Sequence, residues 1–166
     1  MKKVLISLLT AVMIGSTLTA CTSKADNGQK VEQGSKVEFS MPLSEFIIKL
    51  QEKELFGVAD LADDTSATEI YHLNLDNVEE YVVAAPMINA TASFVMIVKA
   101  KDGKVEDVKA SVEKVLEDQI GNAFYPQQKE AVENATVEIK GNYVSLFIYD
   151  AESKEQVEKI YNDSFK

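Results

Sequence analysis

Hydrophobic residues recur at helical spacing in three segments of the chain. The first is residues 42–55, the second is residues 103–124, and the third is the C-terminal segment that carries Val157 and Phe165. In each segment apolar side chains fall three or four positions apart, with charged residues between them. This spacing places the apolar side chains on one face of a helix, so three amphipathic helices are predicted. A shorter helix is expected at residues 67–73.

Residues suited to helix ends stand beside these segments. Pro42 fits the first turn of the first helix, where its missing N–H is not needed, and Ser40 is a candidate N-cap. Asp150 or Ser153 is a candidate cap for the last helix. Pro126 is interpreted as a helix stop.

Between the helices lie four runs of β-branched and aromatic residues, which are typical of strands. They are residues 78–85, 92–100, 135–140 and 143–150. The segment "PMINAT" separates the first two runs. Gly141 and Asn142, a pair suited to the positive φ values of a tight turn, separate the last two. Two β-hairpins are therefore predicted.

The order of these elements predicts an α+β fold in a single domain, residues 41–166, whose second half consists of two ββα units. We expect a four-stranded, mainly antiparallel sheet with the two long helices on one of its faces. The runs "FVMIV" and "VSLFIY" are apolar at nearly every position, which is typical of strands covered on both faces. The N-terminal helices are therefore expected to cover the second face. These patterns leave the strand order open.

Residues 1–20 have the features of a secretory signal, because two lysines precede an uncharged apolar run and then small residues. The run is shorter than the about 20 apolar residues that span a bilayer. It ends in "LTAC", residues 18–21, which resembles the lipobox of bacterial lipoproteins. This resemblance implies cleavage between Ala20 and Cys21, lipid attachment to Cys21, and a location on the extracytoplasmic face of the cell membrane. The alternative is an ordinary secretory signal that contains a cysteine.

Residues 21–40 are polar, rich in Gly, Ser, Lys and Gln, and mostly without periodicity. We interpret them as a flexible, lipidated tether that joins the anchor to the domain. The alternative is that the segment "KVEF" near its end forms an ordered edge strand.

The charge of the chain limits its partners. The formal net charge is −10, and −12 once residues 1–20 are removed, and all 17 basic residues are lysines. Binding to a phosphate backbone requires a basic surface, and bidentate phosphate recognition favours arginine. Nucleic acid is therefore not an expected partner. An acidic surface is also repelled by anionic lipid, so the domain is expected to be held at the membrane by its anchor alone.

The single cysteine and the single histidine limit the chemistry. Lipidation of Cys21 leaves no thiol for a nucleophile, a disulfide or a metal site. His72 is predicted on a short helix without an evident partner, where a surface or packing role is favoured over catalysis. Asp60, Asp63 and Asp64 lack the spacing and central glycine of an EF-hand, so a solvated acidic loop is favoured over a calcium site. No metal or other cofactor is expected.

Three further features carry a family resemblance. A strand ends in "IVKAKDG" before a helix, a "YPQQ" turn follows at residues 125–128, and "KGNYV" stands at residues 140–144. With these features, residues 43–165 resemble the bacterial lipoprotein family called domain of unknown function 4358. The resemblance implies a lipoprotein of the Gram-positive envelope without an established activity, and some relatives are encoded beside membrane-bound O-acyltransferases. It also implies an acidic residue near the start of the second strand, where Ser93 and Phe94 stand.

Two functions of different classes follow. The first is a membrane-anchored, non-catalytic binding or scaffolding module of the cell envelope, with an envelope protein of unknown identity as partner. The second is a small envelope enzyme, or an accessory subunit of an envelope acyl-transfer system, that uses carboxylates with Tyr125 or His72. The candidate functional surface comprises Tyr125, Gln128, Asn142 and Tyr143, which also have structural interpretations in turns or packing. The enzyme hypothesis requires His72, Tyr125 and a carboxylate to meet in one concave pocket.

Overall fold

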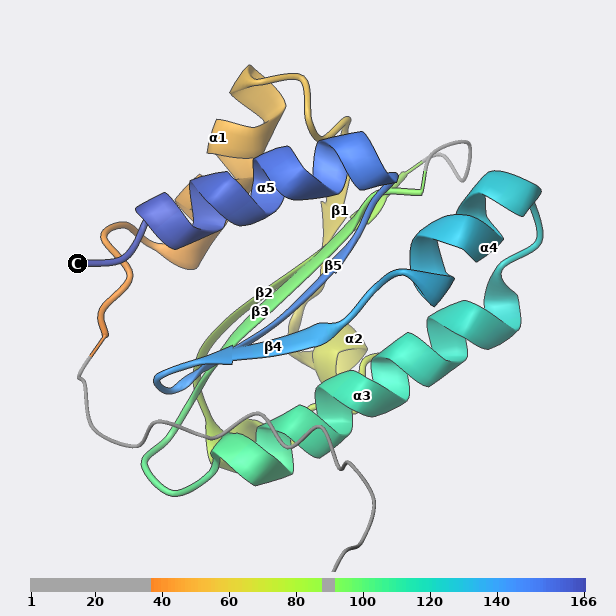
Figure 1. Cartoon of the computed structure of the whole chain (residues 1–166). Helices are drawn as coiled ribbons and strands as arrows, with labels where there is room; N and C mark the ends of the chain where they lie inside the picture. Colours follow the sequence, from red (N-terminus) through yellow and green to blue (C-terminus); the bar gives the residue numbers. More distant parts are fainter. Residues whose placement is uncertain (1–36, 88–91) are drawn as a thin grey trace, which may run out of the picture. The chain divides into compact units, whose positions relative to one another are not determined.

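A five-stranded antiparallel sheet forms the centre of the domain in the computed structural model, which describes residues 37–87 and 92–166 (Figure 1). Its strands are β1 (Ala59–Leu61), β2 (Val78–Pro86), β3 (Phe94–Ala100), β4 (Val137–Lys140) and β5 (Tyr143–Ile148). They lie in the order β1-β2-β3-β5-β4, and every neighbouring pair is antiparallel. The predicted α+β class and antiparallel sheet are confirmed.

Five α-helices and one turn of 3-10 helix connect and cover the strands within the described residues. They are α1 (Leu43–Glu52), α2 (Asp64–Glu69), η1 (Leu75–Asn77), α3 (Val105–Asn122), α4 (Pro126–Glu133) and α5 (Ala151–Asp163). The three helices predicted from amphipathic patterns are present as α1, α3 and α5. The short helix predicted at residues 67–73 is present as α2, but it begins and ends earlier, at Asp64 and Glu69.

β1 is the strand that the sequence pattern does not predict. It has only three residues, two of them exposed, so it shows neither the length nor the alternation that marks a strand. Its backbone pairs with the end of β2, where Ala59 lies opposite Pro86 and Leu61 opposite Ala84. Pairing with β2, rather than local propensity, makes this segment a strand. The predicted count of four strands is therefore wrong.

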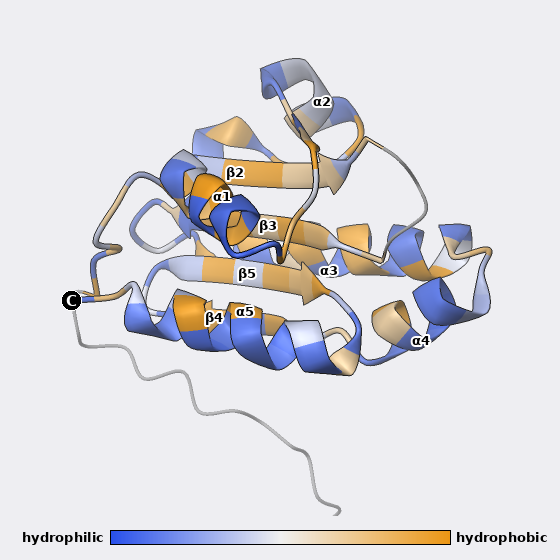
Figure 2. Ribbon diagram, turned by 90° about the horizontal axis from the view of Figure 1, so that it is seen from above, coloured by the Kyte–Doolittle hydropathy of each residue, from blue (hydrophilic) through white to orange (hydrophobic). Residues whose placement is uncertain are grey.

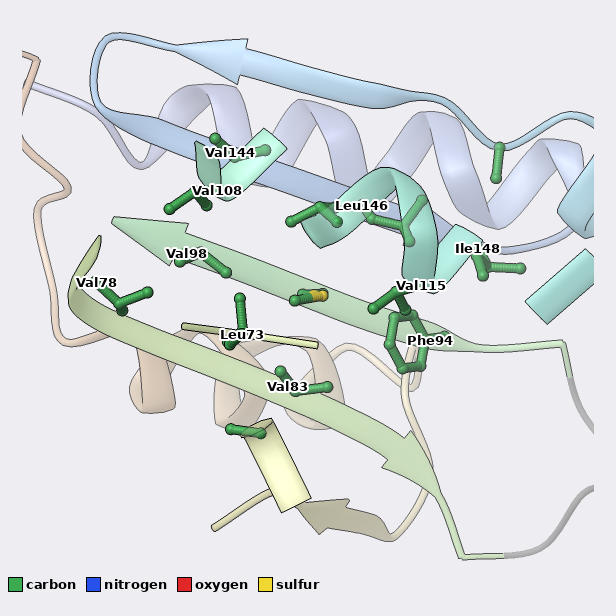
Figure 3. Close-up of a cluster of buried hydrophobic side chains, with 14 of the residues drawn as sticks. Leu73, Val78, Val83, Phe94, Val98, Val108, Val115, Val144, Leu146 and Ile148 are labelled. Atoms are coloured by element: carbon green, nitrogen blue, oxygen red, sulfur yellow. The ribbon is translucent and has the colours of Figure 1, made fainter. Parts of the chain in front are cut away.

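The two long helices cover opposite faces of the sheet, so their predicted placement on one face is also wrong (Figure 1). One core cluster contains Val108 and Val115 of α3 together with Val98 of β3 and Leu146 of β5 (Figure 3). The other cluster joins α1 and α5 to the alternate side chains of the same strands. The prediction that both faces of these strands are covered is confirmed.

Aromatic packing explains why α5 lies on the second face. Along β5, Tyr143 and Phe147 point to that face, whereas Val144 points to the face under α3. Tyr161 of α5 packs edge-on against Phe147, with ring centroids 5.0 Å apart. Its ring also lies 6.1 Å from that of Phe46 on α1. The aromatic side chains of α5 therefore find partners on one face only, and a pattern within the helix alone does not reveal which face that is.

α4 begins at Pro126, so the interpretation of this proline as a helix stop is wrong. Pro126 is the first helical residue, a position where the missing N–H leaves no hydrogen bond unmade. The helix buries Ala131 and Val132 in the core cluster under α3. A proline can follow the end of one helix or occupy the first turn of the next. The sequence around residue 126 therefore allows both interpretations of Pro126.

Both predicted hairpins are present. In the second, Gly141 has a φ of 60°, and Asn142 has a negative φ. A positive φ at the first central residue alone is the pattern of a type II′ turn, which favours glycine there. The turn of the first hairpin includes residues 88–91, which lie outside the described residues.

The N-terminus of α1 is capped from the sheet. Pro42 occupies the N-cap position without a side-chain hydrogen bond, and the N–H of Leu43 donates to Oε1 of Glu80 on β2 at 3.1 Å. A carboxylate is favourable at a helix N-terminus, where N–H groups are otherwise unpaired. The prediction of Ser40 as the cap is wrong, because the N-cap position belongs to Pro42 and the N–H of Ser40 donates to the carbonyl of Ser164.

The described chain begins against β5 and the residues that follow α5. The N–H of Phe39 donates to the hydroxyl oxygen of Tyr143 at 3.2 Å, and the Phe39 ring lies 5.0 Å from that of Phe165. Phe39 and Phe165 also form an isolated β-bridge. The last residues of the predicted tether therefore contact the domain.

The predicted signal peptide, the cleavage site at Ala20 and Cys21, and the tether up to residue 36 lie outside the described residues and stay predictions. Within the part of the chain that is described, no helix combines the length and apolar character needed to cross a membrane.

Candidate functional site

A cavity of about 480 Å³ lies where the end of α3 and the start of α4 meet one end of the sheet. We call it the α3–α4 cavity. Its wall comes from β2, β3, β5, the turn between α3 and α4, and the residue Tyr71 that follows α2. Two residues of the predicted functional surface, Tyr125 and Gln128, line this cavity. The structure therefore brings together one half of the predicted set.

Strand ends form the apolar part of the cavity wall. Phe94 at the start of β3 and Ile148 at the end of β5 line the cavity and also belong to the core under α3 (Figure 3). The Phe94 ring lies 5.8 Å from the ring of Tyr71. Burial, together with the nearby charge of Asp60, raises the pKa of Tyr71, so its hydroxyl keeps its proton at neutral pH. This part of the wall is thus anchored in the rigid core.

Gln128 holds the turn between α3 and α4. Its Oε1 accepts hydrogen bonds from the N–H groups of Phe124 and Tyr125, each at 3.3 Å. Gln128 is the third residue of α4, a position from which a glutamine reaches back to the N–H groups that precede a helix. The turn is fixed by these contacts, and it places Tyr125 at the cavity.

Large aromatic rings stand in solvent beside this cavity. Phe124 is 85 % exposed and Tyr125 is 61 % exposed, and both line the cavity. Met87, next to the lining residue Pro86, is 66 % exposed. Figure 2 shows α4 and the end of α3 extending beyond the sheet at this end of the domain. Exposed apolar side chains that cluster around a cavity are typical of a binding site.

None of the described residues that line the α3–α4 cavity carries a charge, although 27 % of the chain is charged. The polar groups of the lining are hydroxyls and side-chain amides. The amides of Gln119 and Asn122 have no hydrogen bond to another described residue, and each can both donate and accept. The lining therefore suits an uncharged ligand that has both apolar and hydrogen-bonding parts.

Asn142 and Tyr143, the other half of the predicted surface, lie at the opposite end of the sheet. Tyr143 is paired with Lys99 near the end of β3, about 17 Å from Phe94 at the usual rise of a strand. Nδ2 of Asn142 donates to Oδ1 of Asp102 at 3.0 Å, and Tyr143 is only 2 % exposed. Asn142 thus stabilises a turn and Tyr143 belongs to the core, and neither residue lines the cavity.

His72 has a partner that the sequence does not reveal. Its Nε2 lies 2.6 Å from Oδ2 of Asp118 on α3, 46 residues away. His72 follows α2 instead of lying in a helix, and its φ of 54° is uncommon for a residue other than glycine. Neither member of the pair lines the cavity, although their neighbours Tyr71 and Gln119 do. His72, Tyr125 and a carboxylate therefore do not meet in one pocket.

Two of the three acids near α2 have structural partners. Asp63 caps α2 by accepting the N–H of Ser66 at 2.8 Å, and this hydrogen bond holds the pKa of Asp63 below its usual value. Asp64 accepts the hydroxyl of Tyr81 at 2.6 Å, and burial together with this bond raises the pKa of Tyr81 to about 12. Asp60 is exposed and lies in β1. Within the described ranges, no three side chains of the types that bind metals gather.

Two further hollows have charged linings. One of about 620 Å³ between α1 and α5 includes Lys49, Lys53 and Lys159, and one of about 370 Å³ beside α4 includes Glu130 and Asp150. Of the three hollows, only the α3–α4 cavity combines exposed aromatic rings with an uncharged lining. We therefore take it as the candidate site.

Comparison with models of protein families matches residues 58–149 to a family described as a domain of unknown function, DUF4358. The chain belongs to this family. The family resemblance predicted from the sequence is thus confirmed, over a shorter range than residues 43–165. The DUF4358 segment contains all five strands and every described residue that lines the cavity, whereas α1 and α5 lie outside it. No curated protein and no solved structure matches the chain.

The DUF4358 resemblance also predicts an acidic residue near the start of the second strand. That strand is the interior strand β3, and Ser93 and Phe94 at its start both line the α3–α4 cavity. In this chain the position contributes a hydroxyl and an aromatic ring to the wall, and no charge.

Proposed function

We propose that this DUF4358 protein is a membrane-anchored, extracytoplasmic lipoprotein that binds a component of the cell envelope in the α3–α4 cavity. The motivation for the anchor is the lipobox-like "LTAC" at residues 18–21. The observation that carries the binding role is the combination of an uncharged cavity with exposed Phe124 and Tyr125 beside it. Binding, and not catalysis, is the role of the domain.

The geometry of the sheet supports this arrangement. Glu38 approaches Lys99 at the end of β3 that lies away from the cavity, with 3.2 Å between Oε2 and Nζ. Phe94 at the other end of β3 lines the cavity. The N-terminal segment and α4 accordingly lie at opposite ends of the domain (Figure 1). The described chain therefore begins at the end of the domain away from the cavity.

The chemistry of the lining supports binding over catalysis. A hydrolase or acyl-transfer enzyme needs a nucleophile, a base and a group that stabilises an oxyanion, all within reach of one another. The described lining contains no histidine, carboxylate or lysine that could act as the base. Asp118, next in sequence to the lining residue Gln119, is paired with His72. The enzyme hypothesis therefore gains no support from the groups in this cavity.

Variants with one added cysteine test the proposal, because Cys21 is the only cysteine of the chain. A membrane-impermeant maleimide should label Met87→Cys and Ile48→Cys on intact cells, and it should leave the wild type unlabelled because lipid occupies its thiol. Met87 is exposed beside the cavity, and Ile48, 53 % exposed on α1, is the matched control. Met87→Cys should react about threefold more slowly on cells than after purification, as expected when the ligand concentration is about twice its Kd. Ile48→Cys should react equally in both.

Each part of the proposal has its own contradicting outcome. Equal rates on cells and after purification at Met87→Cys would contradict occupation of the cavity. Absence of labelling at both positions on intact cells would contradict the extracytoplasmic location, and labelling of the wild type would contradict lipid on Cys21.

A further inference from the structure

The absence of charge from the described lining of the α3–α4 cavity restricts its ligand. Transfer of a charged group from water into a site without an opposite charge has a large free-energy cost of desolvation. No described lining residue supplies such a charge, and the net charge of −10 adds repulsion against anions. Anionic polymers and charged peptides therefore fit this cavity poorly.

The aromatic rings of the lining suit a ligand with flat C–H faces. Phe124 and Tyr125 are largely exposed, and the rings of Tyr71 and Phe94 contact each other in the same lining. The face of an aromatic ring is electron-rich and attracts weakly positive C–H groups. A sugar ring presents C–H groups on its face and hydroxyl groups around its rim, so it meets an aromatic face with its apolar side.

The side-chain amides of the lining can bind the hydroxyl groups around the rim of a sugar ring. Gln119 and Asn122 are three positions apart on α3 and hence lie side by side on one helix face. Each amide both donates and accepts, as a sugar hydroxyl does, so one hydroxyl can be satisfied in both roles. The Tyr71 hydroxyl, protonated at neutral pH, provides one more donor.

A peptide ligand would find too little free strand edge in this cavity. Peptides commonly bind a sheet by adding a strand to a free edge. The strands that reach this cavity are β2, β3 and β5, which are the interior strands in the order β1-β2-β3-β5-β4. β4 pairs with β5 up to Leu146, so only the last two residues of β5 lie beyond this pairing. The cavity therefore offers side-chain amides and aromatic faces but no free strand edge longer than these two residues.

From these observations we propose that the α3–α4 cavity binds a neutral saccharide. This inference rests on the proposed binding function and names its ligand class. The volume of about 480 Å³ accommodates one or two sugar rings of a longer chain. Phe124 or Tyr125 stacks on a ring, and Gln119 and Asn122 bind its hydroxyls.

Titration calorimetry with the full chain in a zwitterionic detergent without sugar head groups tests this inference. The probes are cellobiose and N,N′-diacetylchitobiose, with digalacturonate as the anionic comparison and a capped tetra-alanine as the uncharged peptide. We expect both neutral disaccharides to bind and the comparison compounds not to bind. Tyr125→Ala should weaken binding about tenfold and Asn122→Ala about fivefold. Ile48→Ala on α1 should leave it unchanged.

Both substituted residues are exposed, and circular dichroism checks that the variants are folded. Failure of both disaccharides to bind would overturn the inference, as would equal binding of digalacturonate or tetra-alanine. Unchanged affinity in both Tyr125→Ala and Asn122→Ala would also overturn it, because the sugar would then bind elsewhere. If the disaccharides fail while Met87→Cys stays protected on cells, the binding function stands and the ligand belongs to another class. If that protection is also absent, both proposals fail.

Discussion

Lys99 shows at the scale of single residues how the N-terminal segment is joined to the sheet. Its Nζ lies 2.9 Å from Oε1 of Glu79 and 3.2 Å from Oε2 of Glu38. The hydrogen bond to Glu79 raises the pKa of Lys99 and outweighs its partial burial, so the ammonium stays charged. One side chain thus ties Glu38 to an interior strand, at the end of the sheet away from the cavity.

Cys21 is the residue on which the proposed anchor depends. We expect Cys21→Ser to lose membrane retention and to have a mass without the diacylglyceryl group, because a hydroxyl does not replace the thiol as the acceptor of lipid. Two acyl chains suffice for stable anchoring, so their loss should release the protein or leave it unprocessed. Cell fractionation and mass spectrometry of the full chain measure both effects. An unchanged mass with unchanged retention would contradict lipidation at this residue.

His72 shows why the contacts of a single residue cannot always be predicted from the sequence. Its partner Asp118 lies 46 residues away on α3, and no local pattern links the two. The positive φ of His72 likewise depends on how the chain leaves α2. Gln128 is different, because its hydrogen bonds to Phe124 and Tyr125 are local and follow from its position in the first turn of a helix.

At the scale of elements, helix caps link stability to pH. Oδ1 of Asp150 accepts the N–H of Ser153 at the start of α5, at 3.0 Å, as predicted. This hydrogen bond holds the pKa of Asp150 below its usual value of 3.8. A lower pKa in the folded state means that ionisation favours folding. The contribution is complete above the usual pKa and is lost as the pH falls through the lowered one.

Asp150→Ala should therefore lower the free energy of unfolding by about 1 kcal/mol at pH 7, and by less near pH 2.5. Asp150→Asn should keep most of the cap at both pH values. Asp163→Ala, at the opposite end of α5, is the matched control, because an acid is unfavourable at a helix C-terminus. Urea denaturation of the full chain at the two pH values measures these differences. An equal loss for Asp150→Ala at both pH values would contradict the link to ionisation.

Elements whose pattern lies within themselves are predictable from the sequence. The apolar stripe of α3 and the Gly141 turn between β4 and β5 are of this kind. β1 is not, because three mostly exposed residues become a strand only by pairing with β2. The start of α4 is also ambiguous, because Pro126 fits both the end and the beginning of a helix.

At the scale of the whole molecule, the sheet has a different core on each of its two faces, and the candidate site lies at one of its two ends. The buried core under α3 is aliphatic apart from Phe94 (Figure 3). The core under α1 and α5 includes six aromatic residues, namely Phe46, Phe56, Tyr143, Phe147, Tyr149 and Tyr161. A stripe on a helix shows that one side is buried but not which face of the sheet receives it. This is why the class of the fold could be predicted and the placement of α5 could not.

The candidate site was predictable only in part for the same reason. Tyr125 and Gln128 stand in a turn that the sequence marks, whereas Gln119 and Asn122 look like ordinary polar positions of a helix. They become a site only when the end of α3 meets Phe94 and the start of α4. The signal that remains in the sequence is the run from residue 119 to residue 128, which is uncharged in a strongly charged chain.

Hydrogen–deuterium exchange tests the central claim, that the α3–α4 cavity is the binding site of the anchored protein, most directly. The full chain is compared in its own membrane and cell-wall preparation and after purification. Bound ligand should slow exchange in peptides that cover residues 119–132 and leave α5 unchanged. Equal exchange of residues 119–132 in both preparations, or protection confined to α1 and α5, would contradict the claim.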